Sequence, residues 1–220
     1  MKLTLVRQTT CWVPTWKGWL LLAAFLFASS CLLGLNLHPF LSPNRPIPAA
    51  TLVIESWMAD YGLEQTAAYL RTNPCQLVVL TGGPLDAGSY LSEFKTFPEV
   101  TAQSLKKLGV PEKLLRVVPS PPAQRDRTYE AALALKSWLN TNAPAVHTLN
   151  LASIGPHARR SQYLFQKALG KDFSVGILAW KDTEYDARKW WQYSKGFRMV
   201  LDETIAYLYA RFWFHPQPAE

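Results

Sequence analysis

The chain begins with one long apolar stretch and then alternates short apolar runs with stretches of helical periodicity. The short runs predict strands over residues 50–55, 76–80, 114–118, 146–152 and 174–178. Several of these runs are apolar on both faces, as buried parallel strands are. Helical patterns occupy residues 60–71, 98–108, 129–140, 156–169 and, as one or two helices, 186–212. This alternation predicts an α/β fold, a Rossmann-like parallel sheet of about five strands with helices on both faces.

Residues 18–37 contain no charged side chain. A helix needs about 20 apolar residues to cross the roughly 30 Å hydrocarbon core of a bilayer. Trp12, Trp16 and Trp19 crowd the N-terminal end of the run, where indole rings favour the membrane interface. The pattern predicts one transmembrane helix over residues 18–37, after a cytoplasmic segment of residues 1–17.

Charge around this run predicts its orientation. The basic side chains that precede it are Lys2, Arg7 and Lys17. Only Arg45 lies in the proline-containing stretch of residues 38–49, which predicts a semi-rigid linker. The positive-inside rule therefore places the N-terminus in the cytoplasm and the domain, residues 50–220, outside the bacterial inner membrane.

A cleaved secretory signal is the rival interpretation of the run. Such signals have a shorter apolar centre that ends at a small-residue site. Residues 28–30 could form that site, and Cys31 would then suggest a lipoprotein. The apolar run continues to Leu35, however, which favours a retained anchor.

Charge and cysteine content narrow the partners. The net charge is +7, but three of the 23 basic residues and none of the 16 acidic residues lie in the first 44 positions. The remainder has a modest excess of four positive charges and no basic run, so a nucleic-acid partner is not expected. Cys75 is the one cysteine of the predicted domain, and no Cys/His pair has metal-ligand spacing. The sequence indicates no metal and identifies no cofactor.

Ligands of parallel α/β sheets bind beyond the carboxyl ends of the strands. After the second predicted strand come Thr81, Gly82 and Gly83, whose backbone could approach an anion closely, although a tight turn is the simpler explanation of this motif taken alone. A polar loop of residues 89–93 follows, and Glu93 in it could face the same crevice or be a solvated acid.

Basic residues stand at two predicted helix starts, where the positive end of the helix dipole disfavours them. Arg125 and Arg127 precede Thr128, which is expected to cap the helix that follows the third strand. After the fourth strand, His157, Arg159 and Arg160 fall in the first turn of a helix. Either the arginines pair with acids on the surface, or an anion such as phosphate binds at both starts.

At these residues the chain resembles the family of unknown-function domains named after ElyC, SanA and YdcF. The matching positions, between about residues 52 and 178, are Gly82, Gly83, Glu93, Thr128, Glu130, His157 and Arg160. The resemblance implies a Rossmann-like domain and, for anchored members, a role in envelope or peptidoglycan assembly. Family members often carry a glycine turn and an arginine after the first strand, where residues 55–60 stand here.

The leading hypothesis is a membrane-anchored protein that binds or processes a phosphate-bearing, possibly polyprenyl-linked, envelope precursor. The glycine pair with Arg125, Arg159 and Arg160 would hold phosphate, and His157 or Glu93 would transfer the proton. Whether the protein is an enzyme is left open, because a scaffold module could carry the same anion pocket. A nucleotide or adenosyl ligand, with Glu55 or Asp60 on a ribose, is a third alternative.

The C-terminal helix has more aromatic residues than one core-facing stripe can absorb. Ile205, Leu208 and Phe212 recur at helical spacing, and further aromatics stand between and after them. The helix is expected either to pack on the sheet with scattered exposed aromatics, or to place its end at the membrane headgroups.

Overall fold

The computed structural model describes residues 11–86 and 92–216. The chain divides into two compact units, the first ending at Asn36 and the second beginning at Leu37. Helix α1 (Trp16–Leu41) has 26 residues and is long and apolar enough to cross a membrane. The most apolar window of this helix is not buried at all, whereas a core helix of a soluble domain would be mostly buried. A secretory signal meets the same criteria of length and composition.

The second unit is built on a parallel sheet, which confirms the predicted fold class. Its strands are β1 (Thr51–Glu55), β2 (Leu77–Gly82), β3 (Leu115–Pro119), β4 (Thr148–Ile154) and β5 (Ser174–Trp180). They lie in the order β3-β2-β1-β4-β5, and every neighbouring pair is parallel. From β1 the chain adds β2 and then β3 on one side of the sheet. It then crosses back to add β4 and β5 on the other side of β1.

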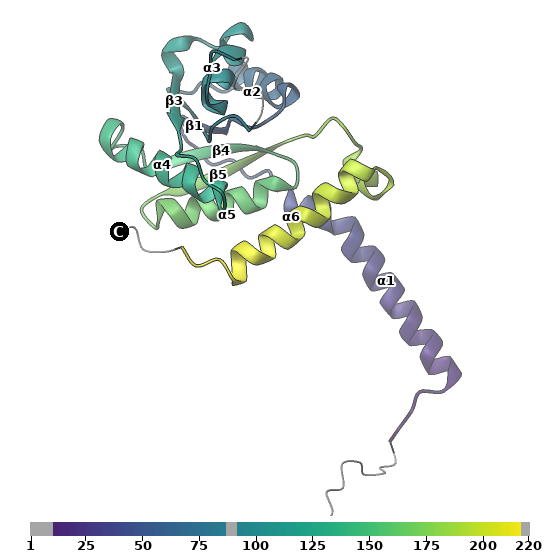
Figure 1. Ribbon diagram of the computed structural model, residues 1–220. Helices are drawn as coiled ribbons and strands as arrows, with labels where there is room; N and C mark the ends of the chain where they lie inside the picture. The colour runs from purple at the N-terminus through teal and green to yellow at the C-terminus, as the bar shows by residue number, and fades with distance from the viewer. Residues whose placement is uncertain (1–10, 87–91, 217–220) are drawn as a thin grey trace, which may run out of the picture. The chain divides into compact units, whose positions relative to one another are not determined.

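Helices cover both faces of this sheet (Figure 1). They are α2 (Asp60–Thr72), α3 (Phe97–Lys107), α4 (Arg127–Asn142), α5 (His157–Leu169) and α6 (Ser194–Phe212), with 3-10 turns η1 (Glu112–Leu114) and η2 (Ala187–Gln192). Side chains of a strand alternate between faces. Leu52 and Ile54 of β1 therefore pack with α2 and α3, while Val53 between them packs with α4 and α5.

The segment expected to be a linker is instead attached to the domain. Helix α1 continues to Leu41, which is buried beside Tyr185, Trp190 and Val200. Further on, the backbone of Arg45 forms an antiparallel bridge with Ile177 of the edge strand β5. The side-chain amide of Asn150 on β4 then holds both backbone groups of Ile47, at 2.9 Å each. Residues 37–47 thus belong structurally to the domain.

Helix α6 packs along α5 with a face that differs from the expected one. Its buried residues include Val200, Glu203 and Ala210, whereas Ile205 and Phe212 of the expected core stripe are largely exposed. The buried set has helical spacing too, so periodicity alone could not choose between the two faces.

Candidate functional site

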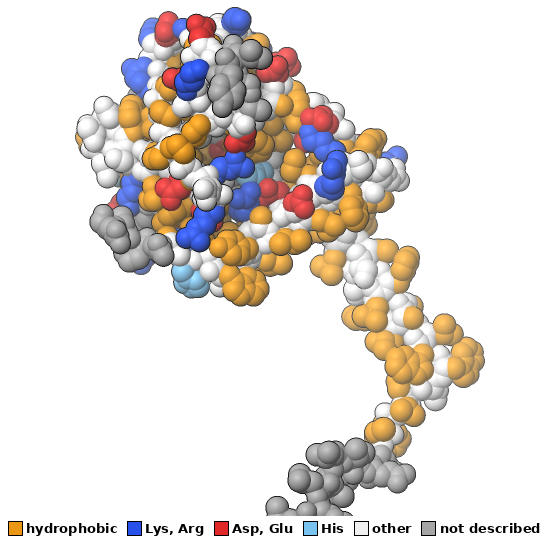
Figure 2. Space-filling model, in the orientation of Figure 1, with side chains coloured by type: hydrophobic (Ala, Val, Ile, Leu, Met, Phe, Trp, Pro, Cys, Tyr) orange, Lys and Arg blue, Asp and Glu red, His pale blue; other side chains and the backbone are white. Residues whose placement is uncertain are grey.

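The polar cluster of the domain lies at the point where the strand order reverses. Glu55 is the last residue of β1. His157 is the first residue of α5, and the turn of residues 155–156 connects it to the end of β4. Because β1 and β4 are neighbours whose following helices lie on opposite faces, their carboxyl ends flank a topological switch point, where ligands of such sheets usually bind. On the face drawn in Figure 2, basic, acidic and histidine side chains gather around a hollow beside α6.

Four charged side chains form one buried network at this point. His157 Nδ1 lies 2.8 Å from Glu203 Oε1, and its Nε2 forms a longer ion pair with Glu55 Oε1 at 3.4 Å. Arg160 donates to both oxygens of Glu203, from Nε at 2.8 Å and from Nη2 at 3.0 Å. Since carboxylates only accept, His157 Nδ1 carries the hydrogen that points to Glu203.

The two carboxylates keep His157 charged despite its burial. Burial alone would lower the pKa of His157, but the negative charges of Glu55 and Glu203 outweigh it and raise the pKa to about 9. For Glu55 and Glu203 burial acts in the opposite direction, yet the imidazolium of His157 holds the pKa of both below the usual range. At neutral pH the network therefore holds two positive and two negative charges.

Several buried polar atoms around this network have no hydrogen-bond partner among the described residues. They are Glu55 Oε2, Ser56 Oγ, Ser153 Oγ and Ser161 Oγ, although the hydroxyls of Ser153 and Ser161 lie near enough to Glu55 to help lower the pKa of its carboxyl group. Buried polar groups normally find a partner, so a concentration of unpaired ones marks a place where water or a ligand binds. Trp57, which is partly exposed, lies edge-on over His157 with ring centroids 4.7 Å apart. The site thus offers a charged donor, a carboxylate acceptor and hydroxyl groups under an aromatic ring.

The predicted phosphate-binding arginines have different surroundings. Arg125 is exposed just ahead of α4 and forms no ion pair with any described residue. Arg160 is held by Glu203, and Asp126 also contributes to the raised pKa of Arg160, so the starts of α4 and α5 lie near each other. Arg159 instead stacks on Phe40, with its guanidinium carbon 3.9 Å from the ring centroid, and donates to the Phe40 carbonyl.

The charges expected to need an external anion at the start of α5 have protein anions instead. Glu203 of α6 and Glu55 of β1 neutralise Arg160 and His157. At the start of α4, Arg127 pairs with exposed Asp86 at 2.9 Å, which leaves Arg125 as the basic side chain there without a carboxylate among the described residues. Basic residues at a helix start are therefore explained here mainly by tertiary pairing.

The other predicted binding residues are Thr81, Gly82, Gly83 and Thr128, and the contacts they make lie within the fold. Thr81 is buried and donates its hydroxyl to the Ala131 carbonyl at 3.1 Å, which ties β2 to α4. Gly82 is buried where an added Cβ would meet Ser56 and Pro98, whereas Gly83 is only partly buried. Thr128 is the second residue of α4 rather than its N-cap, because the left-handed Asp126 ends the loop.

Glu93, the second candidate for proton transfer, does not join the cluster. It is exposed and forms no hydrogen bond or ion pair with a described residue. Residues 89–91 of its loop lie outside the described residues. Among the described residues, no group of three or more His, Cys, Asp and Glu side chains is placed to hold a metal ion.

Glu203 is the residue of the charged network that the sequence does not predict. A signal for it exists, because Val200, Glu203, Tyr207 and Ala210 recur every three or four residues. An acid on the apolar face of a helix needs a cation when that face is buried. From the sequence, Glu55 is predicted only as a ribose ligand, although it ends an otherwise apolar strand.

A separate groove of about 570 Å³ lies between β3 and α4. Val117, Pro119, Glu130 and Trp138 contribute to its lining, and none of the four charged residues of the network does. Its walls are mainly apolar and carry none of the buried polar atoms described at the switch point.

The chain matches no protein-family model, no curated protein and no solved structure.

Proposed function

We propose that this is a bacterial envelope protein, anchored in the inner membrane by α1, whose domain binds a phosphate-bearing polar ligand outside the cytoplasm. The observation that carries the proposal is the ion pair of Glu55 and His157 at the switch point, beside the buried hydroxyl groups of Ser56, Ser153 and Ser161. The basic residues ahead of α1 support the orientation. The resemblance to the ElyC, SanA and YdcF family supports an envelope precursor as ligand.

The charges suggest how such a ligand would be oriented. Arg125 is exposed next to Asp126, which interacts electrostatically with Arg160, so Arg125 would stand at the rim of the site. It has no carboxylate partner among the described residues, which suits it to a phosphate oxygen. Within the network, Glu55 would repel a phosphate, so the phosphate lies toward the rim and a neutral oxygen of the ligand lies inside. Charged His157 would donate a proton to that oxygen, and Glu55 would accept one from a hydroxyl or from water.

A polyprenyl-linked sugar phosphate has this distribution of groups. Its phosphate lies between an apolar chain and a polar sugar, and the exposed edge of Trp57 offers a surface on which a sugar ring could pack. In an enzyme, protonation of the departing oxygen by His157 would assist cleavage of the bond to phosphorus or to the sugar.

A non-catalytic scaffold is the second candidate, and the balanced network is the observation that favours it. Glu203 joins α6 to His157 and Arg160 of α5, and Glu55 joins the same histidine to β1. Such an arrangement can fix three elements in place without any turnover.

The two candidates differ in turnover, so the test is an assay of the full-length protein in nanodiscs with a polyprenyl-diphosphate-linked sugar. Binding and release of phosphate or sugar are measured for the parent protein and for Arg125→Gln, His157→Gln and Arg71→Gln. Arg71 is the control, since it is an exposed arginine at the far end of α2.

For an enzyme, His157→Gln should lower kcat by about 10²–10⁴-fold, as loss of a general acid does. Arg125→Gln should weaken binding by about 10–100-fold, the worth of a charge-assisted hydrogen bond. Arg71→Gln should change neither. Saturable binding without any product would establish the scaffold, and absence of binding by the parent protein would refute the phosphate ligand altogether.

A further inference from the structure

Helix α6 carries a row of large apolar side chains that the described residues leave exposed by more than a third. Exposed fractions reach 68% for Ile205 and 63% for Phe212. The full row, called here the outer face of α6, consists of Phe197, Leu201, Ile205, Leu208 and Phe212. Steps of three or four residues place these side chains on one side of the helix. The opposite side, with Val200, Glu203 and Ala210, is buried on the domain.

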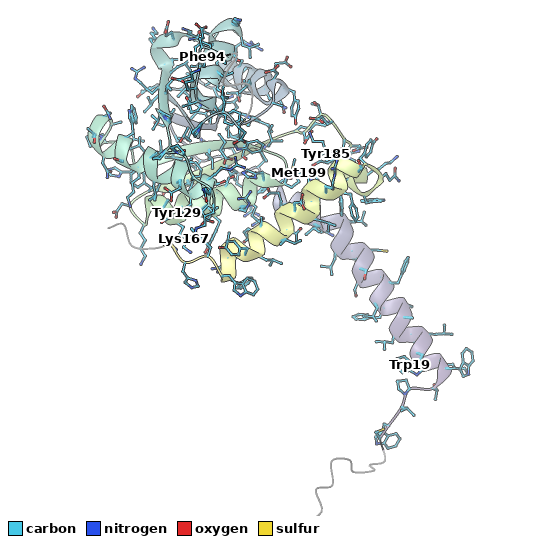
Figure 3. All side chains as sticks on the ribbon, viewed as in Figure 1. Trp19, Phe94, Tyr129, Lys167, Tyr185 and Met199 are labelled. Carbon is cyan, nitrogen blue, oxygen red and sulfur yellow. The ribbon has the colours of Figure 1, made fainter. Side chains whose placement is uncertain are left out.

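Both ends of α6 are fixed to the domain, so the outer face is held outward. Tyr185 packs beside the first half of the helix, and Tyr129 and Lys167 lie by its end (Figure 3). Tyr129 contacts Phe214 edge-on, with ring centroids 5.0 Å apart, and Lys167 Nζ donates to the Phe214 carbonyl oxygen at 2.6 Å. The helix cannot turn to bury the outer face without breaking these contacts. Single exposed apolar residues are ordinary on a protein surface, but a continuous row marks an interaction surface.

The packing of the anchor end on α6 indicates which partner covers the outer face. Leu41, the last residue of α1, is buried in one cluster with Val200, and Phe40 lies edge-on to Tyr207 with centroids 5.8 Å apart. The apolar residues that could cross the membrane precede these two directly in the chain. Helix α6 is therefore attached within a few residues of the place where the chain leaves the bilayer.

The composition of the outer face matches a helix that lies in a membrane interface. Arg198 and Arg211 stand near its two ends and are exposed, where long basic side chains can reach lipid phosphates. Tyr209 and Trp213, exposed by 50% and 67%, extend the row at its C-terminal end. Such aromatic residues favour the headgroup layer. From Phe197 to Phe212 the row runs about 22 Å at 1.5 Å per residue.

We propose that the outer face of α6 lies on the lipid bilayer in which α1 is anchored, with its apolar side chains at the boundary of headgroups and acyl chains. The domain is then held at the membrane by two elements, the span itself and a helix lying along the surface. This surface is independent of whether the switch-point site binds a phosphate, since the residues of the outer face take no part in that site.

The test measures contact with lipid in the full-length protein. The three native cysteines are replaced, and a polarity-sensitive fluorophore is attached to Ile205→Cys or, as a control, to Lys107→Cys. Lys107 is exposed at the end of α3, which covers the other face of the sheet. Each protein is reconstituted at one copy per nanodisc of phosphatidylethanolamine and phosphatidylglycerol, with and without lipids spin-labelled near the headgroup.

The label at residue 205 should emit as in an apolar medium and lose about half of its emission to the spin-labelled lipids, because interfacial helices bury their apolar face roughly 5–10 Å deep. The label at residue 107 should stay unquenched. Replacing Leu201 and Phe212 by serine should reduce quenching at residue 205 at least twofold.

Two results would overturn the proposal. Equal, water-like emission from both labels would show that lipid does not cover the outer face. Apolar emission at residue 205 that appears only in liposomes with many copies, without quenching by the spin-labelled lipids, would assign the face to a second copy of the chain.

Discussion

The charged state of His157 makes a quantitative prediction about stability and pH. Histidine in an unfolded chain has a pKa near 6.5, whereas Glu55 and Glu203 raise the pKa of folded His157 to about 9. Between these values the folded protein binds more protons than the unfolded chain. The contribution of His157 is therefore complete below about pH 6.5 and is lost as pH rises through 9.

The size of the effect follows from the difference between the two pKa values. Each pKa unit corresponds to about 1.4 kcal/mol, so the free energy of unfolding should fall by about 3 kcal/mol between pH 6 and pH 9.5. For a domain of this size such a change lowers Tm by about 6–12 °C. Glu55 and Glu203 do not interfere in this range, because their lowered pKa values make their contribution disappear only as pH falls below about 4.5. Burial lowers the pKa of His38, so the contribution of His38 rises with pH, but only up to about pH 7, above which unfolded histidine is neutral as well.

The assay is thermal and urea unfolding of the full-length protein in detergent, measured at half-unit steps of pH. Cys75 is replaced by alanine throughout, since burial raises the pKa of its thiol and would add a loss of stability above pH 8.5. His157→Gln should remove most of the decline, while His147→Gln, at an exposed histidine, should leave it intact. A flat or rising stability profile in the parent protein, or the same decline in His157→Gln, would refute the charge assigned to His157.

Three further substitutions test the ion pairs and the packing of the domain. Glu203→Gln should destabilise the domain by about 3–5 kcal/mol, because it leaves buried cations without their carboxylate, and Asp202→Asn next to it should cost less than about 0.5 kcal/mol in the same urea titration. Leu41→Ala should lower the free energy of unfolding by about 2–5 kcal/mol, although Leu41 lies at the end of the anchor helix. An unchanged free energy of unfolding would show that residues 38–49 are a linker after all. Gly196→Ala should prevent stable folding at 37 °C, since its Cβ would stand 2.6 Å from the Trp190 carbonyl oxygen. Parent-like circular dichroism and Tm would disprove that contact.

The sheet could be predicted because its strands are apolar on both faces. Val53, between Leu52 and Ile54, is as buried as its neighbours, and only a strand covered on both sides tolerates that pattern. Strand and helix positions agree with the sequence to within a few residues. By contrast, residues 38–49 look like a linker by composition, and only the bridge of Arg45 to Ile177 reveals their place on the sheet edge.

The sequence predicts where the charged cluster lies but not which residues pair in it. Strand carboxyl ends point to His157 and Arg160 without knowledge of the structure. Their partner Glu203 lies 46 and 43 residues away on another helix, and no local pattern in the sequence specifies such a distance. An excess of cations was visible at the helix start, but whether the anion comes from the protein or from a ligand depends on tertiary packing.

The last turn of α1 packs in the core of the domain, so cleavage at the end of the apolar run would destabilise the domain. Cleavage after Ser42 would remove Leu41 and leave Tyr185, Trp190 and Val200 facing solvent. It would also take away His38, whose Nε2 lies 3.0 Å from the Tyr185 hydroxyl. A soluble fragment intended for crystallisation should therefore begin no later than Leu37. A protease that cut the chain at this position would therefore release a destabilised domain.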